Sequence, residues 1–184
     1  MSGIFFLFLS DNYYPNWRVK VNDSRNNQSN WSSIYQVTIN SDITITLQND
    51  NINFTTLTSG DENDTLDNSP RPFNLTNDGN SFVNISINAT DDLWTTQANP
   101  SQFFQFRSNE TGETGSFNVA LSNTTIWRNI PPITGLTAAI ALLNYSNSND
   151  SAEIEIRIQA PLDEPPGAKS AIINLLAELT SKTL

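Results

Sequence analysis

Short runs in which apolar and polar residues alternate recur along nearly the whole chain, and they constrain the fold more than any other feature. The clearest are residues 35–39, 43–47, 82–89 and 154–158. Such alternation places apolar side chains on one face of a β-strand, and the Gly-, Asn-, Asp- and Pro-rich stretches between the runs are turn signals. About ten short strands of this kind predict an all-β fold, a single β-sandwich or jelly-roll domain.

Further runs predict strands at residues 17–21, 52–57, 73–75, 103–106, 117–121 and 138–143. Residues 73–89 are the clearest predicted hairpin, because the Asp78-Gly79 pair favours a turn with positive φ. Residues 138–143 are apolar enough to predict a central strand, and the charges within residues 154–158 are expected to face outward. Residues 171–179 fit a helix face or a strand; Ala, Leu and Glu favour a helix, but the all-β context leads us to predict a strand.

An unbroken apolar run near the start of the chain consists of Ile4, Phe5, Phe6, Leu7, Phe8 and Leu9. A run without polar residues is typical of a strand that is covered on both faces, and its full burial is worth on the order of 10 kcal/mol. Its own domain, a membrane and a groove in a neighbouring copy compete as the destination. The run is too short to span a bilayer, and no basic residue precedes it as in a signal peptide.

Packing in its own domain and donation to a neighbouring copy are nearly balanced for this run. Donation is favoured because the run is terminal, because residues 12–16 can act as a hinge, and because a sheet that lacks a strand would otherwise expose a sticky edge. We therefore predict a donor strand and hinge at residues 1–12 and a sandwich domain at residues 13–184. Head-to-tail donation does not close on itself, so it predicts a homopolymeric filament.

Composition excludes several classes of function. The net charge of -10 and the pI near 4.2 argue against binding to nucleic acid or to an anionic membrane surface. Because the chain has no cysteine and no histidine, it offers no disulfide, no zinc site of the usual kind, no thiol nucleophile and no serine–histidine pair. We expect a protein that is not an enzyme and that needs no metal or cofactor.

Asparagine followed at the second position by Ser or Thr marks a possible site for N-linked sugar. The chain has 12 such sequons, at Asn22, Asn27, Asn30, Asn53, Asn63, Asn74, Asn84, Asn88, Asn109, Asn123, Asn144 and Asn149. A chain rich in Asn, Ser and Thr produces some sequons by accident. Their number nevertheless favours a secreted glycoprotein at the cell surface, with N-linked glycans as its expected modification.

Acidic and aromatic residues supply weaker candidates. The clusters Asp61-Glu62-Asn63-Asp64 and Asp91-Asp92 could bind calcium, but their spacing matches no known calcium loop, and solvated turns are the preferred interpretation. Nothing in the sequence sets two carboxylates opposite each other for glycoside cleavage. The side chains of Trp17, Trp31, Trp94 and Trp127 could stack on sugars, yet each lies beside a strand pattern, where packing is the more usual role.

The stretch INFTTLTSGDENDTLDNSPRPFNLTNDGNSFVNISINATDDLW, residues 52–94, resembles the TasA/camelysin-like pattern of an aromatic strand, a PGD-type turn, a strand, an N-x-G turn and an aliphatic strand. Ser59 stands where that pattern has proline, and the later turn is Asn77-Asp78-Gly79. Residues 151–179 look like the closing strands of archaeal cell-surface β-sandwiches. The resemblance implies a jelly-roll subunit of archaeal bundling pili or threads, in which the N-terminal strand completes the sheet of the next subunit. The metalloprotease activity associated with the camelysin name has no histidine here to support it.

Together these features predict an extracellular, N-glycosylated structural subunit that polymerises by donor-strand complementation. A surface-layer or adhesin-like glycoprotein domain is the alternative. A carbohydrate-binding module or a glycosidase ranks third.

Overall fold

The computed structural model of the chain describes residues 14–17, 30, 35–37 and 40–180, and the side chains of residues 30 and 40–180. The chain divides into two compact units, residues 1–41 and residues 42–184. The predicted donor strand at residues 4–9 and the predicted boundary after residue 12 lie outside the described residues.

The first unit contains a short antiparallel pair. Strand β1 (Tyr14–Trp17) pairs with β2 (Tyr35–Val37), with an irregularity in the register. The strands predicted at residues 17–21 and 35–39 overlap this pair at Trp17 and at β2, and their other residues lie outside the described part.

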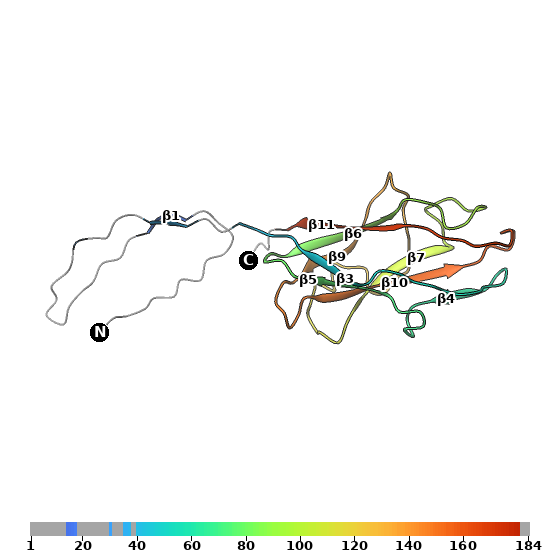
Figure 1. Cartoon of the computed structure of the whole chain (residues 1–184), viewed down its shortest axis with the longest axis horizontal. Coiled ribbons are helices and arrows are strands. Elements are labelled where there is room, and N and C mark those ends of the chain that lie inside the picture. Colours follow the sequence, from blue (N-terminus) through green and yellow to red (C-terminus); the bar gives the residue numbers. More distant parts are fainter. Residues whose placement is uncertain (1–13, 18–29, 31–34, 38–39, 181–184) are drawn as a thin grey trace. The chain divides into compact units, whose positions relative to one another are not determined.

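The second unit consists of two antiparallel sheets, and its described residues form no helix. Its strands are β3 (Ile45–Asn49), β4 (Glu62–Asp64), β5 (Phe73–Asn77), β6 (Val83–Ala89), β7 (Phe104–Glu110), β8 (Arg128–Asn129), β9 (Thr137–Leu143), β10 (Ser151–Gln159) and β11 (Ile173–Leu179). The larger sheet has the order β3-β5-β10-β7-β8, with β4 also paired to β10, and the smaller has the order β11-β6-β9. Figure 1 shows β6 and β11 on one side of the unit and β4 and β10 on the other. The predicted all-β class is confirmed, and the jelly-roll topology stays a prediction.

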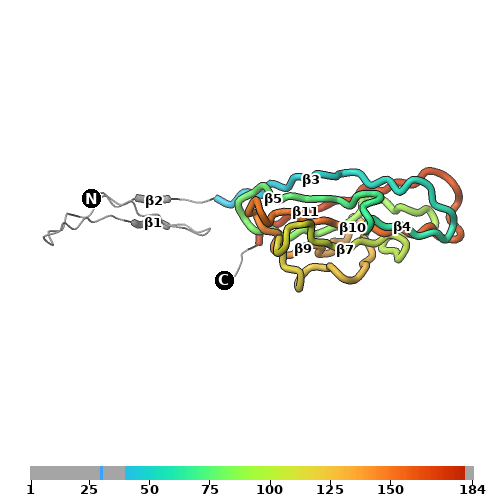
Figure 2. The backbone as a smooth tube through the Cα atoms, turned by 90° about the horizontal axis from the view of Figure 1, so that it is seen from below, coloured from blue at the N-terminus to red at the C-terminus, as the bar shows by residue number. Residues whose placement is uncertain are grey.

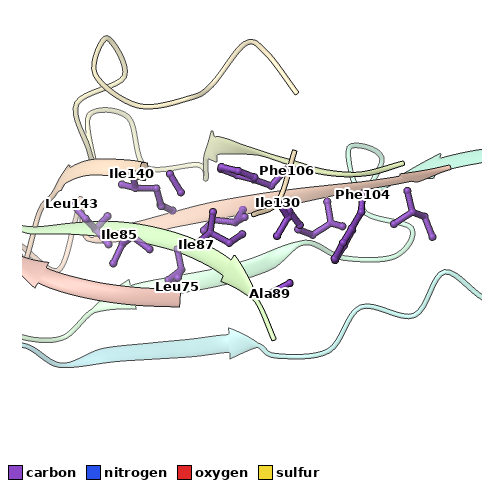
Figure 3. Close-up of a cluster of buried hydrophobic side chains, with 14 of the residues drawn as sticks. Leu75, Ile85, Ile87, Ala89, Phe104, Phe106, Ile130, Ile140 and Leu143 are labelled. Atoms are coloured by element: carbon purple, nitrogen blue, oxygen red, sulfur yellow. The ribbon is translucent and has the colours of Figure 1, made fainter. Parts of the chain in front are cut away.

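The two sheets share one hydrophobic core because their central strands alternate. Odd-numbered residues 83–89 of β6 and even-numbered residues 152–158 of β10 are all buried. Phe106 from β7 and Leu75 from β5 are fully buried in the same cluster (Figure 3). Burying each large apolar side chain contributes about 1.5–3 kcal/mol, so this layer of contacts holds the two sheets together.

The prediction that residues 73–89 form a hairpin is wrong. β5 pairs with β3 and β10, whereas β6 pairs with β11 and β9, so the turn between them crosses from one sheet to the other. The buried side chain of Asn77 sets this crossing: its Nδ2 donates to the backbone oxygens of Ser81 at 3.0 Å and Leu143 at 3.2 Å. A buried amide with these partners replaces the ladder hydrogen bonds that a hairpin would have made.

The expected positive φ at the Asp78-Gly79 turn is also absent, since neither residue is among those with positive φ. Gly79 is needed for space instead. A Cβ at this position would collide with the backbone oxygen of Asp42. The Asp-Gly pair therefore marks a close approach of two backbone segments and not a hairpin turn.

Two other predictions between β3 and β5 are wrong. Residues 52–57 form no strand, although Ile52, Phe54 and Leu57 pack half-buried against the core, and Thr55 interrupts the run with a φ of 60°. The acidic cluster at residues 61–64, which was interpreted as a solvated turn, contains β4, and this strand pairs with the end of β10. Pairing to a central strand outweighs the low β-propensity of its Glu, Asn and Asp residues.

Residues 117–121 form a turn where a strand was predicted. Phe117 is buried, but Val119 is 43% exposed and Leu121 is 68% exposed, so the alternation does not continue. The strand predicted as central at residues 138–143 corresponds to β9, which lies at the edge of the smaller sheet. The strand predicted at residues 171–179 is confirmed as β11.

The described residues contain no helix that is long and apolar enough to cross a membrane.

Candidate functional site

A β-sandwich offers its strand edges as interaction sites, and the edge at β9 is covered. The segment that follows Phe117 lies along it: the backbone nitrogen of Asn118 donates to the oxygen of Ala141 at 2.9 Å, and the nitrogen of Ala141 donates to Oγ of Ser122 at 2.9 Å. The nitrogen of Asn123 donates to the oxygen of Ala139 at 3.3 Å. These contacts occupy the outer backbone groups of β9, so another strand cannot pair there.

The edges of the larger sheet are short or irregular. β8 has only 2 residues, and β3 has 5 residues with a shift of register between Leu47 and Asn49. Short edge strands and bulges are the usual means by which proteins prevent further pairing.

The edge at β11 is neither short nor irregular, and no described segment covers it. This strand has 7 residues, runs in regular register with β6, and in the described part of the chain pairs with β6 alone. Figure 2 labels β11 among the other strands of the second unit. The nitrogen of Thr180 donates to the oxygen of Phe82, and that of Thr90 donates to the oxygen of Ile172. Because hydrogen-bonding sides alternate along an antiparallel strand, the even-numbered residues face β6 and the odd-numbered residues 173–179 point their backbone groups away from the sheet.

Apolar side chains flank this open edge on both faces. On the core side, Ile173, Leu175 and Ala177 are only half-buried and Leu179 is 51% exposed, whereas on the outer side Leu176 is 39% exposed. A shallow hollow of about 650 Å³ borders this strand. This hollow is lined by Asn88, Ile133, Ile173, Asn174, Leu175 and Leu176.

The outer face of the larger sheet carries a buried carboxylate. Glu155 was expected to face outward into solvent; it faces away from the core, but it is only 2% exposed. Its carboxylate accepts hydrogen bonds from Oγ1 of Thr65 and from Nδ2 of Asn109, the latter at 3.1 Å. The hydroxyl of Thr65 also accepts a hydrogen bond from the backbone nitrogen of Ile156 at 3.0 Å. It therefore connects the carboxylate of Glu155 to the backbone of β10.

Two arginines flank an indole on the same face. The guanidinium carbons of Arg107 and Arg157 lie 5.2 Å and 5.0 Å from the ring centroid of Trp127, within the range of cation–π attraction. Arg157 also binds the side-chain oxygen of Gln105, and the buried Nε of Arg107 has no hydrogen-bond partner among the described residues.

Glu153 completes this acidic and basic face. Burial raises the pKa of its carboxyl, the charge of Glu155 raises it further, and a hydrogen bond from Asn74 opposes both effects. A neighbouring shallow hollow of about 350 Å³ is lined by Gln48, Asn49, Asn68, Arg71, Pro72, Asn74 and Glu153.

Comparisons with known proteins were made by family model, by curated sequence and by solved structure. None gave a match. The resemblance to TasA/camelysin-like subunits therefore stays a prediction.

The structure places the sequon asparagines in different environments. Asn30 and Asn53 are exposed, whereas Asn88 and Asn123 are buried, and Asn22 and Asn27 lie outside the described residues. The remaining sequons are half-buried, at Asn63, Asn74, Asn84, Asn109, Asn144 and Asn149.

In each acidic cluster, an aspartate accepts hydrogen bonds from a neighbouring segment. The carboxylate of Asp61 accepts hydrogen bonds from the hydroxyl and the backbone nitrogen of Thr58, and these bonds lower the pKa of its carboxyl. Asp92 accepts the backbone nitrogen of Asn99 at 2.7 Å. Among the described residues, no group of three acidic side chains is placed to hold a metal ion. Trp94 is buried and donates from Nε1 to the backbone oxygen of Phe103, which is a packing role.

Glu164 connects two loops. Its carboxylate accepts hydrogen bonds from the backbone nitrogens and hydroxyls of Thr95 and Thr96, and it forms an ion pair with Lys169. Desolvation acts to raise the pKa of this carboxyl, but the hydrogen bonds from Lys169, Thr95 and Thr96 outweigh it and hold the pKa well below its ordinary value. The site is a structural cross-link at the surface.

Proposed function

We propose that the chain is a structural subunit of an extracellular, N-glycosylated filament, polymerised when residues 4–9 of one copy add as a strand to the sandwich of the next. The observation that carries this proposal is that an antiparallel sandwich unit with an unprotected edge strand occurs in the same chain as an apolar run that must be covered on both faces. The donation of residues 4–9 brings these two features together.

The acidic composition agrees with this role. A net charge of -10 keeps subunits soluble and prevents non-specific association, so that specific contacts decide assembly. Exposed sequons such as Asn30 and Asn53 fit a surface that carries sugar. In this role the chain has no catalytic turnover and needs no cofactor beyond its glycans.

Electron microscopy of the purified full chain tests the proposal, and uniform fibres are the expected result. The variant Phe6→Asp places a charge in the middle of the apolar run and should abolish the fibres. Ser10→Asp adds the same charge just outside the run, so it is the matched control and should leave fibres of normal length. Monomers or a planar lattice from the unaltered chain would instead favour a surface-layer or adhesin-like glycoprotein domain.

A further inference from the structure

The edges of the sandwich unit differ in whether they can accept another strand. The β9 edge is occupied by the segment from Asn118 to Asn123, β8 has only 2 residues, and β3 contains a register shift. β11 alone among these edges has 7 residues in unbroken register and no strand on its outer side in the described part of the chain.

The side chains at the β11 edge indicate what kind of strand it accepts. A strand added beside β11 would continue both faces of the smaller sheet. Its core-side residues would lie next to Leu175 and Leu179, and its outer residues next to Leu176. A partner strand that is apolar on both faces fits this edge. An ordinary amphipathic strand would place its polar face either against Leu176 or against the core-side residues Leu175 and Leu179.

Residues 4–9 have this property. Six apolar residues in succession offer apolar side chains to both faces, and at about 3.3 Å per residue they extend about 20 Å, close to the length of β11. The only charged residue in β11 is Glu178, and residues 4–9 carry no charge, so no like charges oppose each other along the added pair.

From this match we infer that β11 is the acceptor edge and that residues 4–9 of a second copy pair with it. The inference rests on the proposed function and adds the location of the contact. The backbone nitrogens and oxygens of residues 173, 175, 177 and 179 form the new ladder, while the even-numbered residues keep their hydrogen bonds to β6.

Ala177 offers a selective way to close this edge. Its backbone nitrogen points away from β6, so Ala177→Pro removes a donor from the open side and leaves the β6 ladder in place. Ala177→Thr keeps the donor and is the matched control. We expect Ala177→Pro to reduce fibre mass at least tenfold while its thermal unfolding stays cooperative, and Ala177→Thr to assemble like the unaltered chain. Leu179→Lys, which keeps every backbone group, should give the same loss through a charge on the edge.

Disulfide trapping tests the same contact without blocking it, because the chain contains no cysteine of its own. Full-length Ala177→Cys is mixed with full-length chains that carry one cysteine at each position from 4 to 9, under oxidising conditions. We expect a cross-linked dimer of unlike chains at one or two of these positions. Leu47→Cys on the β3 edge is the control and should give no cross-link.

The outcomes separate the two proposals. If the unaltered chain forms no fibres, the proposed function fails. If it forms fibres but the cross-links go to Leu47→Cys, or if both Ala177→Pro and Leu179→Lys assemble normally, β11 is not the acceptor and the filament proposal stands. Cross-linking confined to Ala177→Cys, together with loss of fibres in the proline variant, supports the inference.

Discussion

Nδ2 of Asn88 donates a hydrogen bond to the backbone oxygen of Gly135 at 3.0 Å, so the atom that would carry a sugar points into the protein. Oδ1 of the same side chain accepts a hydrogen bond from Nδ2 of Asn174 on β11, at 2.9 Å. Asn88 therefore links β6 to its neighbouring strand and to the loop before β9. A sequon in the sequence is thus a structural residue in the fold.

Glycan occupancy should follow this difference in environment. When the full chain is produced in a host that glycosylates secreted proteins, we expect sugar at Asn30 and Asn53 and none at Asn88 or Asn123, because only the first two amides are exposed. Mass spectrometry of proteolytic peptides measures each site. Modification at Asn88 in folded, soluble protein would contradict the structure around Gly135.

The hydroxyl of Thr65 should contribute measurably to stability. Thr65→Val removes one of the two side-chain donors to the buried carboxylate of Glu155 and the acceptor for the backbone nitrogen of Ile156. Leaving buried polar groups without partners costs about 1–3 kcal/mol each, so we expect the free energy of unfolding to fall by at least that amount in urea titrations. Thr46→Val, at an exposed position on β3, is the control and should change it by less than about 0.5 kcal/mol.

Phe106 should be among the most sensitive core positions. It is completely buried between the two sheets, and Phe106→Ala leaves a cavity where its ring lies. Such substitutions cost about 3–5 kcal/mol, which is a large part of the stability of a domain of this size. Leu121→Ala, at a side chain that is 68% exposed, should have almost no effect in the same denaturant assay.

Glu164 should stabilise the folded protein at neutral pH, and this contribution should be lost in acid. Its pKa in the folded state lies below the ordinary 4.5, so its contribution is complete above that value and is lost as the pH falls through the folded pKa. We expect Glu164→Gln to melt at a lower temperature than the unaltered chain at pH 7, with the difference shrinking as the pH falls below 4.5. An equal difference at pH 7 and pH 3 would contradict the role given to its charge.

The charge of Glu153 should have the opposite effect on stability, lowering it at neutral pH. Burial raises its pKa above the ordinary 4.5, so folding favours the protonated form, and that contribution is lost as the pH rises through the folded pKa. Glu153→Gln should therefore melt at a higher temperature than the unaltered chain at pH 7, with little difference in acid. Scanning calorimetry across the pH range distinguishes the two variants.

Periodicity identified the core strands well and the connections poorly. β6 and β10 were predictable because their alternation coincides with burial of one face, as Ile85 and Ile156 illustrate. The partners of β5 and β6 were not, since a hairpin and a crossing between sheets have the same local sequence around Asp78-Gly79, and only the long-range contact between Asn77 and Leu143 distinguishes them. β4 was missed because pairing to β10 determines its conformation more than its own residues do.

The candidate site was predictable in part. The sequence indicated a strand at residues 171–179, but it could not indicate which edge would be left open, because that depends on where the segment around Asn118 lies. It also could not identify Glu155 as buried, since the alternation of β10 gives only the face and not what covers it. Thr65, which covers that carboxylate, follows the acidic cluster at residues 61–64, where the sequence indicated a solvated turn and not a strand.

The position of β10 in the chain determines the order in which the protein is completed. This strand joins β4, β5 and β7 in the larger sheet, yet it occupies residues 151–159, after all three of its partners. During synthesis these three strands leave the ribosome before the strand that joins them, so the larger sheet cannot be completed until most of the chain has been made. A chain cut short before β10 would therefore lack the strand that joins β4, β5 and β7 in the larger sheet.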